Sequence, residues 1–281
     1  MAQTLKTWLQ QARQALLSAE IEAADQEARL LLCFALDVKA AYLFAWPEQQ
    51  LNPEQTVKLQ QLLHQRLQGQ PLAWILGEWE FWGLPLKVTP ATLIPRADSE
   101  TLVEQALEVC TQPRARVLDL GTGTGALALA LKKERPDWHL DAVDVQPAAV
   151  QLARENARRL GLDVRFWVSD WWQGVPQQHY DLVISNPPYI HPQDPHLKQG
   201  DLRFEPRSAL VGGQDGLEAY RQLLKPLGRF LRPGGWFLVE HGYDQAEALA
   251  ALCQQAGLEA LACQQDYAGQ PRVTLGRYPK G

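Results

Sequence analysis

The sequence lacks a hydrophobic run long enough to cross a membrane. No window of its 281 residues approaches the roughly 18 apolar residues that a spanning helix requires. The first twenty residues have the pattern of an amphipathic helix and not the continuous apolar stretch of a signal peptide. We therefore expect a soluble, cytoplasmic protein.

Cysteines are few, and positive charge is not in excess. The four cysteines, Cys33, Cys110, Cys253 and Cys263, form no Cys-x-x-Cys pair and have no close histidine in a zinc-binding pattern. We expect reduced thiols and no metal site. The net charge of −5 argues against a general basic surface for nucleic acid, so no stable nucleic acid binding is expected.

Helical patterns fill the amino-terminal part of the chain. Apolar side chains recur at helical spacing over residues 4–18 and again over about 25–36. A third pattern begins at 52–55, "NPEQ", which combines a capping asparagine, a first-turn proline and a glutamine at the third helical position. Residues 1–84 are therefore predicted to form a small helical domain.

The pattern changes after Gly69, a predicted helix C-cap. Glycines and prolines then punctuate alternating apolar residues, which predicts a short hairpin and a connector. We place this hairpin and connector at residues 85–95 and a second domain at residues 96–281.

From Arg114 onward strands and helices alternate, which is typical of a parallel sheet with crossover helices. Two closely spaced final runs, near 258–264 and 271–277, predict an antiparallel pair at the sheet edge. One irregular segment, His191–Asp215, is longer than most connections in compact domains. Earlier strands are expected near 115–120, 139–144, 164–168, 180–185 and 234–240, and helices near 125–134, 147–160, 216–231 and 243–256.

Glycines follow the first strand of the predicted sheet. The run "VLDLGTGTGALALAL" passes through Gly121, Thr122, Gly123, Thr124 and Gly125 into a helix rich in alanine and leucine. Glycine lets the backbone turn tightly and approach a ligand, and the carboxyl ends of parallel strands are where α/β proteins bind cofactors. A purely structural tight turn also explains these glycines.

Acidic and aromatic residues follow the next two strands. Asp144 comes about 20 residues after the glycines, where a carboxylate can accept both hydroxyls of a ribose. Asp170 and Trp171 can bind an adenine amine and cover its ring. Asp144 can instead cap the helix from Pro147, and Trp171 can be a core residue. Together these strand ends predict an adenosine-containing cofactor, and NAD fits the first two of them.

The fourth strand ends in Asn186-Pro187-Pro188-Tyr189. Because prolines cannot continue a central strand, this pair either simply ends the strand or forms a rigid turn whose carbonyls are free to bind a ligand. The turn resembles the signature of S-adenosylmethionine-dependent methyltransferases that methylate an amide or exocyclic amino nitrogen on an sp² carbon. NAD binding does not explain it.

Such a nitrogen is a poor nucleophile because its lone pair is delocalised. If the side-chain oxygen of Asn186 and the carbonyl of Pro187 each accept one N–H, the lone pair turns toward the methyl donor. Tyr189 can stack on the planar amide. The chemistry then requires positioning and no dedicated general base.

Nearly the whole chain resembles the HemK/PrmC family of protein-(glutamine-N5) methyltransferases. The connector "GEWEFWGLPLKVTPATLIPRADSETLVEQAL", the glycine run, "SNPPYI" and "FEPRSALVGGQDGLEAYRQLL" follow in the family's order and spacing. The resemblance implies a class I S-adenosylmethionine-dependent methyltransferase domain, an α/β Rossmann-like fold, behind a helical-bundle domain that recognises the substrate. It implies that the glutamine of the Gly-Gly-Gln motif in class I peptide chain release factors is methylated.

The resemblance also assigns roles to residues. Asn186, Pro187 and Tyr189 are the predicted catalytic residues, and with Pro188 they are predicted to bind the substrate amide. Ala97 departs from the family's usual proline, and His241 replaces an isoleucine that many relatives have, which we interpret as a strand-end residue and not a base. Glu205 either borders the glutamine pocket or lies in a surface loop. The predicted cofactor contacts are Gly121, Thr122, Gly123, Thr124, Gly125, Asp144, Asp170, Trp171 and Asn186.

Two alternatives remain open from the sequence. A methyltransferase for an exocyclic amine of adenine or guanine in nucleic acid would use the same turn, but the acidic balance and the absence of a basic RNA-binding module disfavour it. A non-catalytic adenosine-binding adaptor is the other, and the intact Asn-Pro-Pro-Tyr turn argues against it.

Overall fold

The computed structural model describes residues 3–280 of the chain. Contacts within the chain divide it into two compact units, Met1–Gly77 and Glu78–Gly281. The division falls before the hairpin, whereas the sequence analysis extended the helical domain to residue 84 and placed the hairpin in the connector. The reason is that the hairpin, β1 (Glu78–Phe81) and β2 (Leu84–Lys87), bonds to the second unit: the Lys87 amide donates to Asn156 Oδ1 at 2.8 Å.

The first unit is helical, as predicted. A partly buried ion pair between Arg66 and Glu27, with Nε and Oε2 2.6 Å apart, joins the fourth helix to the second. The capping box is present, because the Gln55 amide donates to Asn52 Oδ1 and the Asn52 amide donates to Gln55 Oε1. Its helices are α1 (Leu5–Ser18), α2 (Ala24–Leu36), α3 (Ala40–Ala45), α4 (Pro53–Leu67) and α5 (Leu72–Leu76).

A two-residue turn closes the hairpin. Trp82 and Gly83 both have positive φ, +54° and +65°, a combination that matches the twist of paired strands. The Trp82 amide donates to Oε1 of Glu100, the first residue of α6 (Glu100–Val109), at 2.8 Å. This bond ties the turn to α6.

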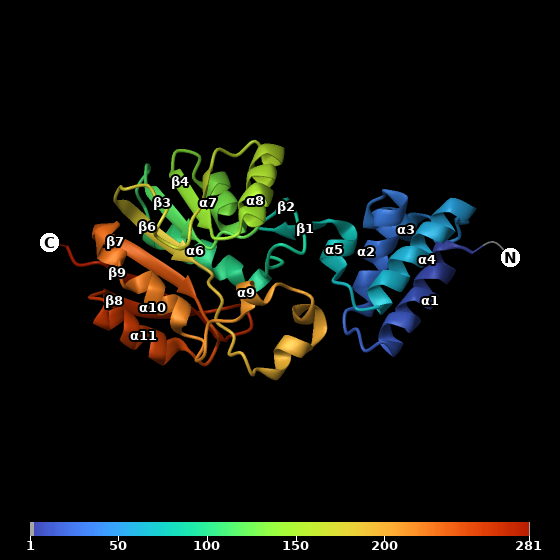
Figure 1. Ribbon diagram of the computed structural model, residues 1–281. Coiled ribbons are helices and arrows are strands. Elements are labelled where there is room, and N and C mark those ends of the chain that lie inside the picture. The colour runs from blue at the N-terminus through green and yellow to red at the C-terminus, as the bar shows by residue number, and fades with distance from the viewer. Residues whose placement is uncertain (1–2, 281) are drawn as a thin grey trace. The chain divides into compact units, whose positions relative to one another are not determined.

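Within the described residues of the second unit, seven strands form a sheet in the order β5-β4-β3-β6-β7-β9-β8 (Figure 1). Strands β5, β4, β3, β6 and β7 pair in parallel, and β9 is antiparallel to both β7 and β8, as the sequence predicted for this edge. The strands are β3 (Arg116–Leu120), β4 (His139–Asp144), β5 (Arg165–Val168), β6 (Tyr180–Ser185), β7 (Leu231–Glu240), β8 (Glu259–Gln265) and β9 (Pro271–Arg277).

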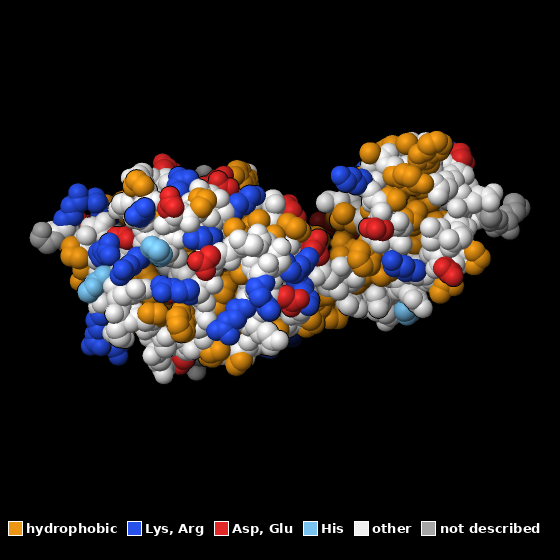
Figure 2. All heavy atoms as spheres, turned by 90° about the horizontal axis from the view of Figure 1, so that it is seen from above, with side chains coloured by type: hydrophobic (Ala, Val, Ile, Leu, Met, Phe, Trp, Pro, Cys, Tyr) orange, Lys and Arg blue, Asp and Glu red, His pale blue; other side chains and the backbone are white. Residues whose placement is uncertain are grey.

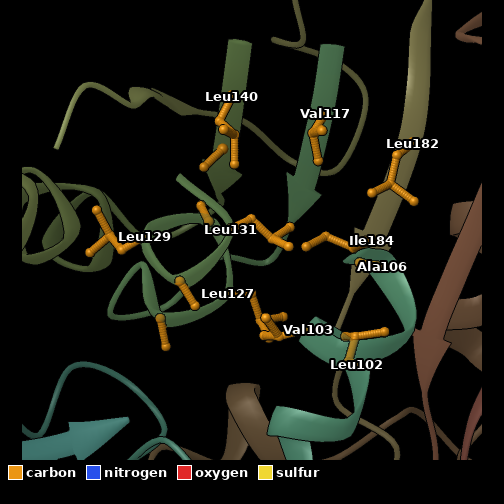
Figure 3. Close-up of a cluster of buried hydrophobic side chains, with 14 of the residues drawn as sticks. Leu102, Val103, Ala106, Val117, Leu127, Leu129, Leu131, Leu140, Leu182 and Ile184 are labelled. Carbon is orange, nitrogen blue, oxygen red and sulfur yellow. The ribbon is translucent and has the colours of Figure 1, made fainter. Parts of the chain in front are cut away.

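Helices cover both faces of this sheet. On one face α6, α7 (Ala126–Glu134) and α8 (Pro147–Leu160) pack on alternate strand residues such as Val117 and Ile184. Figure 3 shows the side chains of α6 and α7 meeting those of β3 and β6. On the other face α10 (Glu218–Leu224) and α11 (Ala246–Gln255) pack on Leu118 and Val183. Burial of alternate residues on opposite faces fixes the register of the strands.

The order of the strands positions the site. Strand β3 lies between β4 and β6, so the chain order reverses there and the carboxyl ends of these strands border a crevice. The helix predicted over 216–231 is shorter, since α10 gives way near Pro226 to the 3₁₀ helix η4 (Leu227–Arg229). Residues 191–215 contain η2 (Pro195–Lys198), η3 (Gly200–Arg203) and α9 (Arg207–Leu210). Across residues 3–280, none of the helices has the length and hydropathy of a membrane span.

Candidate active site

A cavity of about 290 Å³ lies at the carboxyl ends of β3, β4 and β6, inside the second unit. Its size is near the lower end of the range for small-molecule sites, roughly 300–1,000 Å³. Of the predicted site residues, Gly125, Pro187 and Tyr189 do not line it. Those that do line it are Gly121, Thr122, Gly123, Thr124, Asp144, Asp170, Trp171, Asn186 and Pro188.

The glycine turn has a backbone that only glycine adopts readily. Gly121, Gly123 and Gly125 have φ values of +79°, +55° and +86°. A Cβ added at Gly125 would lie 3.1 Å from a Leu129 carbon and 3.2 Å from the Ala153 Cβ. Gly125 therefore permits close packing of α7 and α8, while Gly121 and Gly123 bring the backbone to the cavity wall.

Asp144 holds the glycine turn against the end of β4. Its Oδ2 atom accepts the Gly123 amide and its Oδ1 atom accepts the Gln146 amide, both at 2.9 Å. Gln146, and not Asp144, is the N-cap residue of α8. Burial raises the pKa of Asp144. Each carboxylate oxygen keeps capacity for a further hydrogen bond, so the side chain can bind a ligand hydroxyl without releasing the turn.

Trp171 covers the glycine turn from the other side. A Cβ added at Gly121 would lie 3.6 Å from the Trp171 ring. The backbone of Trp171 has a φ of +47°, and Ser169 Oγ supports it by donating to the Trp171 carbonyl at 2.7 Å. The neighbouring Trp172 is buried and stacks on Phe230 with ring centroids 4.7 Å apart. Of the two tryptophans, Trp171 alone lines the cavity, and Trp172 is the core residue.

The connector contributes a polar atom that the sequence analysis did not consider. Thr92 lines the cavity, and its Oγ1 atom is buried without a hydrogen-bond partner in the described part of the chain. A buried hydroxyl left without a partner is costly. An unpaired hydroxyl in the wall of a cavity fits a site that receives a polar ligand.

Asn186 is held by a chain of hydrogen bonds to residues distant in sequence. Its Nδ2 atom donates to Ser99 Oγ at 3.0 Å, and Ser99 Oγ donates to Glu240 Oε2 at 2.5 Å. The hydroxyl of Tyr189 donates to Glu240 Oε1 at 3.3 Å. Glu240 is buried at the end of β7, and burial raises its pKa to about 7.

Ser99 and Glu240 were not predicted as site residues from the sequence. Neither belongs to a recognisable motif, and they approach Asn186 only after the sheet has formed. The one available signal was the position of Glu240, a carboxylate at the last residue of a strand predicted to be buried, which requires a partner.

The Asn-Pro-Pro-Tyr turn is also fixed on its far side. The Tyr189 carbonyl accepts Gln245 Nε2 at 3.0 Å, and the Ile190 carbonyl accepts the Gly212 amide at 3.1 Å. A Cβ added at Gly212 would lie only 2.6 Å from the Pro188 carbonyl oxygen. The end of the 191–215 segment therefore packs directly against the turn.

Neither His241 nor Glu205 is among the residues that line the cavity. His241 is buried, with Nδ1 2.8 Å from the Gly242 carbonyl and Nε2 3.0 Å from Thr274 Oγ1, and it does not line the cavity. Glu205 is buried, accepts the Ile94 amide at 3.0 Å and forms an ion pair with Arg96, which does line the cavity. Glu205 thus supports the cavity wall from behind.

The fold and this cavity define a methyltransferase, and family comparisons identify both parts of the chain. Residues 98–201 match the family model "Methyltransferase small domain", and residues 7–77 match "PrmC N-terminal domain". A methyltransferase of known structure from Pyrococcus furiosus has the same fold, with a TM-score of 0.54, 20% identity and coverage of 70% of this chain and 90% of that one. The predicted fold class is confirmed.

Relatives that match over nearly the full length identify the family of methyltransferases to which the chain belongs. A release factor glutamine methyltransferase from Vibrio cholerae is 44% identical over 280 residues, covering 99% of this chain and 98% of the relative. Another from Xylella fastidiosa is 47% identical over 268 residues, covering 94% and 98%. The chain belongs to the release factor glutamine methyltransferase family, which confirms the resemblance seen in the sequence.

Proposed function

We propose that this protein transfers a methyl group from S-adenosylmethionine to the side-chain amide nitrogen of the glutamine in the Gly-Gly-Gln motif of class I peptide chain release factors. The names of the full-length relatives support the substrate. The observation that carries the chemistry is the orientation of Asn186 in the cavity wall. Because its Nδ2 atom is engaged by Ser99, its Oδ1 atom remains as the acceptor for a substrate N–H.

The residues of the cavity fit the cofactor. S-adenosylmethionine supplies a methyl group already activated by a positively charged sulfur. Asp144 would bind the ribose hydroxyls, and Asp170 with Trp171 would bind the adenine. Apolar side chains such as Phe81, Leu127 and Ala149 line the same cavity and exclude water from it.

The turn would then position the acceptor amide. Asn186 Oδ1, in the cavity wall, and the carbonyl of Pro187, which follows it but does not line the cavity, would accept its two N–H groups, which would turn the nitrogen lone pair toward the methyl group. Tyr189 is held by its hydroxyl at Glu240, which fixes the ring beside the turn. Pro188, in the cavity wall, limits where the amide can lie. The reaction depends on the alignment of the amide nitrogen with the methyl group and on the exclusion of water more than on acid–base catalysis.

The helical unit would select the protein substrate. A glutamine with its two neighbouring glycines offers too little surface to be distinguished from other glutamines, so recognition needs contacts beyond the reacting group. Figure 2 shows hydrophobic side chains gathered on the visible face of this unit, and its exposed apolar residues include Phe34, Phe44, Trp46 and Val57. We assign to this unit the binding of a release factor region away from its Gly-Gly-Gln loop. A cytoplasmic location, expected from the sequence, stays a prediction.

The test uses a purified, unmethylated class I release factor, total RNA and DNA as separate acceptors with a radiolabelled methyl donor. Label in the release factor, and a single added methyl on the Gly-Gly-Gln glutamine by mass spectrometry, is the expected result. A release factor with alanine in place of that glutamine is the control and should remain unlabelled. Label in nucleic acid alone would favour the exocyclic-amine alternative, which the full-length relatives do not support.

A further inference from the structure

We propose that Ser99 and Glu240 are positioning residues that set which end of the Asn186 amide faces the substrate. The inference rests on the proposed function and adds two residues to its machinery. Asn186 can perform its role only if its oxygen, and not its NH₂ group, points to the acceptor amide. Nothing in the asparagine itself decides between these two orientations, because both ends have nearly the same shape.

The hydrogen bonds around Glu240 determine the orientation of the Asn186 amide. An ionised carboxylate only accepts, so both hydroxyls that contact it, Ser99 Oγ at 2.5 Å and Tyr189 at 3.3 Å, must donate to it. Ser99 has then used its single proton and can only accept from Asn186. The NH₂ group of Asn186 is therefore the end that bonds Ser99, at 3.0 Å, and the oxygen is left for the substrate.

Protonation of Glu240 removes this constraint. A neutral carboxyl group can donate to Ser99 Oγ, and the Ser99 proton is then free to bond the oxygen of a flipped Asn186. The flipped side chain presents donors to the substrate amide, which also presents donors, so the acceptor nitrogen is no longer held. No atom is transferred to the substrate in this step, and the proton stays between Glu240, Ser99 and solvent.

The groups around Glu240 determine the pH at which its carboxyl group ionises. Burial opposes its charge, and Arg272 on β9 favours the charge while Asp98 of η1 (Ala97–Ser99) opposes it. Tyr189 and Ser99 donate to the charged form, and Tyr220 of α10 donates to the Glu240 carbonyl at 3.0 Å. Arg272 is itself paired with Asp266 at 3.0 Å, and burial lowers the pKa of the neighbouring His241.

Turnover should follow this ionisation. With the pKa of Glu240 raised to about 7, kcat of the wild type should rise with pH through about 7 and level off above it, since only the ionised form fixes the productive orientation. Ser99→Ala should lower kcat by about 10- to 100-fold with little change in cofactor affinity, the scale of a misplaced reacting group. Ser99→Thr keeps the hydroxyl and should restore most of the rate. Glu240→Gln should lose the rise near pH 7.

Ser185→Ala is the matched control. It also removes a buried serine hydroxyl, one that donates to the Leu120 carbonyl at 2.6 Å and takes no part in the hydrogen bonds that join Asn186, Ser99 and Glu240. It should lower stability without altering the shape of the pH profile. Wild-type kcat and pH dependence in folded Ser99→Ala and Glu240→Gln would overturn the proposal, as would a wild-type kcat that is flat from pH 6 to 8.5.

A second measurement does not depend on turnover or on the substrate. In wild-type protein labelled with ¹³C and ¹⁵N, the side-chain amide resonances of Asn186 should shift with pH at the same midpoint as the carboxyl carbon of Glu240. Ser99→Ala should uncouple the two. Asn186 resonances that do not change as Glu240 titrates would refute the proposed coupling of Glu240 to Asn186 through Ser99. A wild type that methylates no release factor yet shows the coupled titration would refute the proposed function alone.

Discussion

Asp144 illustrates how a single side chain prepares the site before a ligand arrives. Its two oxygens hold the glycine turn and the start of α8 at once, through the amides of Gly123 and Gln146. A carboxylate fixed in this way would lose little conformational freedom on binding a ribose, the role that we propose for it. The sequence left ribose binding and helix capping open for Asp144. Gln146 is the N-cap residue of α8, and ribose binding by Asp144 stays a prediction.

Asp144→Ala should weaken binding of S-adenosylmethionine and of its demethylated product by about 1–3 kcal/mol, because charge-assisted hydrogen bonds to the ligand are lost. Isothermal titration calorimetry gives this value directly. Asp163→Ala, at an exposed position, is the charge-matched control. NAD should bind neither protein, and an unchanged affinity in Asp144→Ala would limit Asp144 to bracing the turn.

Asn186→Ala should separate chemistry from binding. The substitution removes the acceptor for the substrate N–H but leaves the contacts expected for the adenosine, so kcat should fall by roughly 10²–10³-fold while cofactor affinity changes little. His241→Ala is the comparison, since its ring nitrogens are occupied by Gly242 and Thr274 away from the cavity. A collapse of kcat in a folded His241→Ala protein would instead make His241 a base.

At the scale of elements, the Asn-Pro-Pro-Tyr turn depends on the segment that follows it. The carbonyl of Pro188 faces Gly212, where no side chain fits, and the Gly212 amide closes a bond to Ile190. Residues 191–215 therefore act as a clamp on the turn, and their buried Glu205 secures the clamp to Arg96.

Gly212→Ala tests the clamp. Its backbone has no positive φ, so the effect of the new methyl group is steric: it would meet the Pro188 carbonyl at 2.6 Å and the Gly216 carbonyl at 2.7 Å. The turn must shift, and kcat should fall about 10-fold or more with cofactor affinity retained. Gly200→Ala, in the same segment with open space around its Cβ, should strain only its own backbone and keep kcat near that of wild type.

The sequence was sufficient for features that depend on local patterns. The period of apolar residues predicted the sheet and most of its helices, and the capping box at Asn52 predicted the start of α4. Short helices such as α3 and α5 were not predicted. They have six and five residues, less than two helical turns, so a 3.6-residue repeat of apolar residues cannot be recognised in them. Ser99 and Glu240 were not predicted because only the folded sheet brings them to Asn186.

At the scale of the whole molecule, the chain contains two units that match separate family models. The cavity and all predicted cofactor residues belong to the second unit. The first contributes none of them, yet it exposes aromatic side chains such as Phe44 and Trp46, which are 69% and 60% exposed. Large exposed aromatic residues are typical of surfaces that bind another protein.

Phe44→Glu and Trp46→Glu should raise KM for an intact release factor by about 5- to 50-fold, because a charge replaces an apolar contact, and should leave cofactor affinity unchanged. Gln14→Glu adds the same charge at an exposed polar position of α1 and should have no such effect. The second comparison uses an isolated Gly-Gly-Gln peptide, whose methylation these substitutions should not alter. Equal catalytic efficiency of the wild type on peptide and release factor would show that the helical unit does not select the substrate.

The positive φ of Trp171 bears on how selection for stability has acted at this position. A bulky residue at a φ of +47° is held in a conformation that costs on the order of 1–3 kcal/mol, a cost that asparagine or glycine would largely avoid. Trp171→Asn should therefore keep a thermal midpoint within about 3 °C of wild type, although an indole is lost, while adenosine binding weakens. Trp172→Asn, which removes the ring stacked on Phe230, should lower the midpoint far more. Selection for stability alone would replace Trp171, so we expect that the residue is retained for the adenine that we propose it covers.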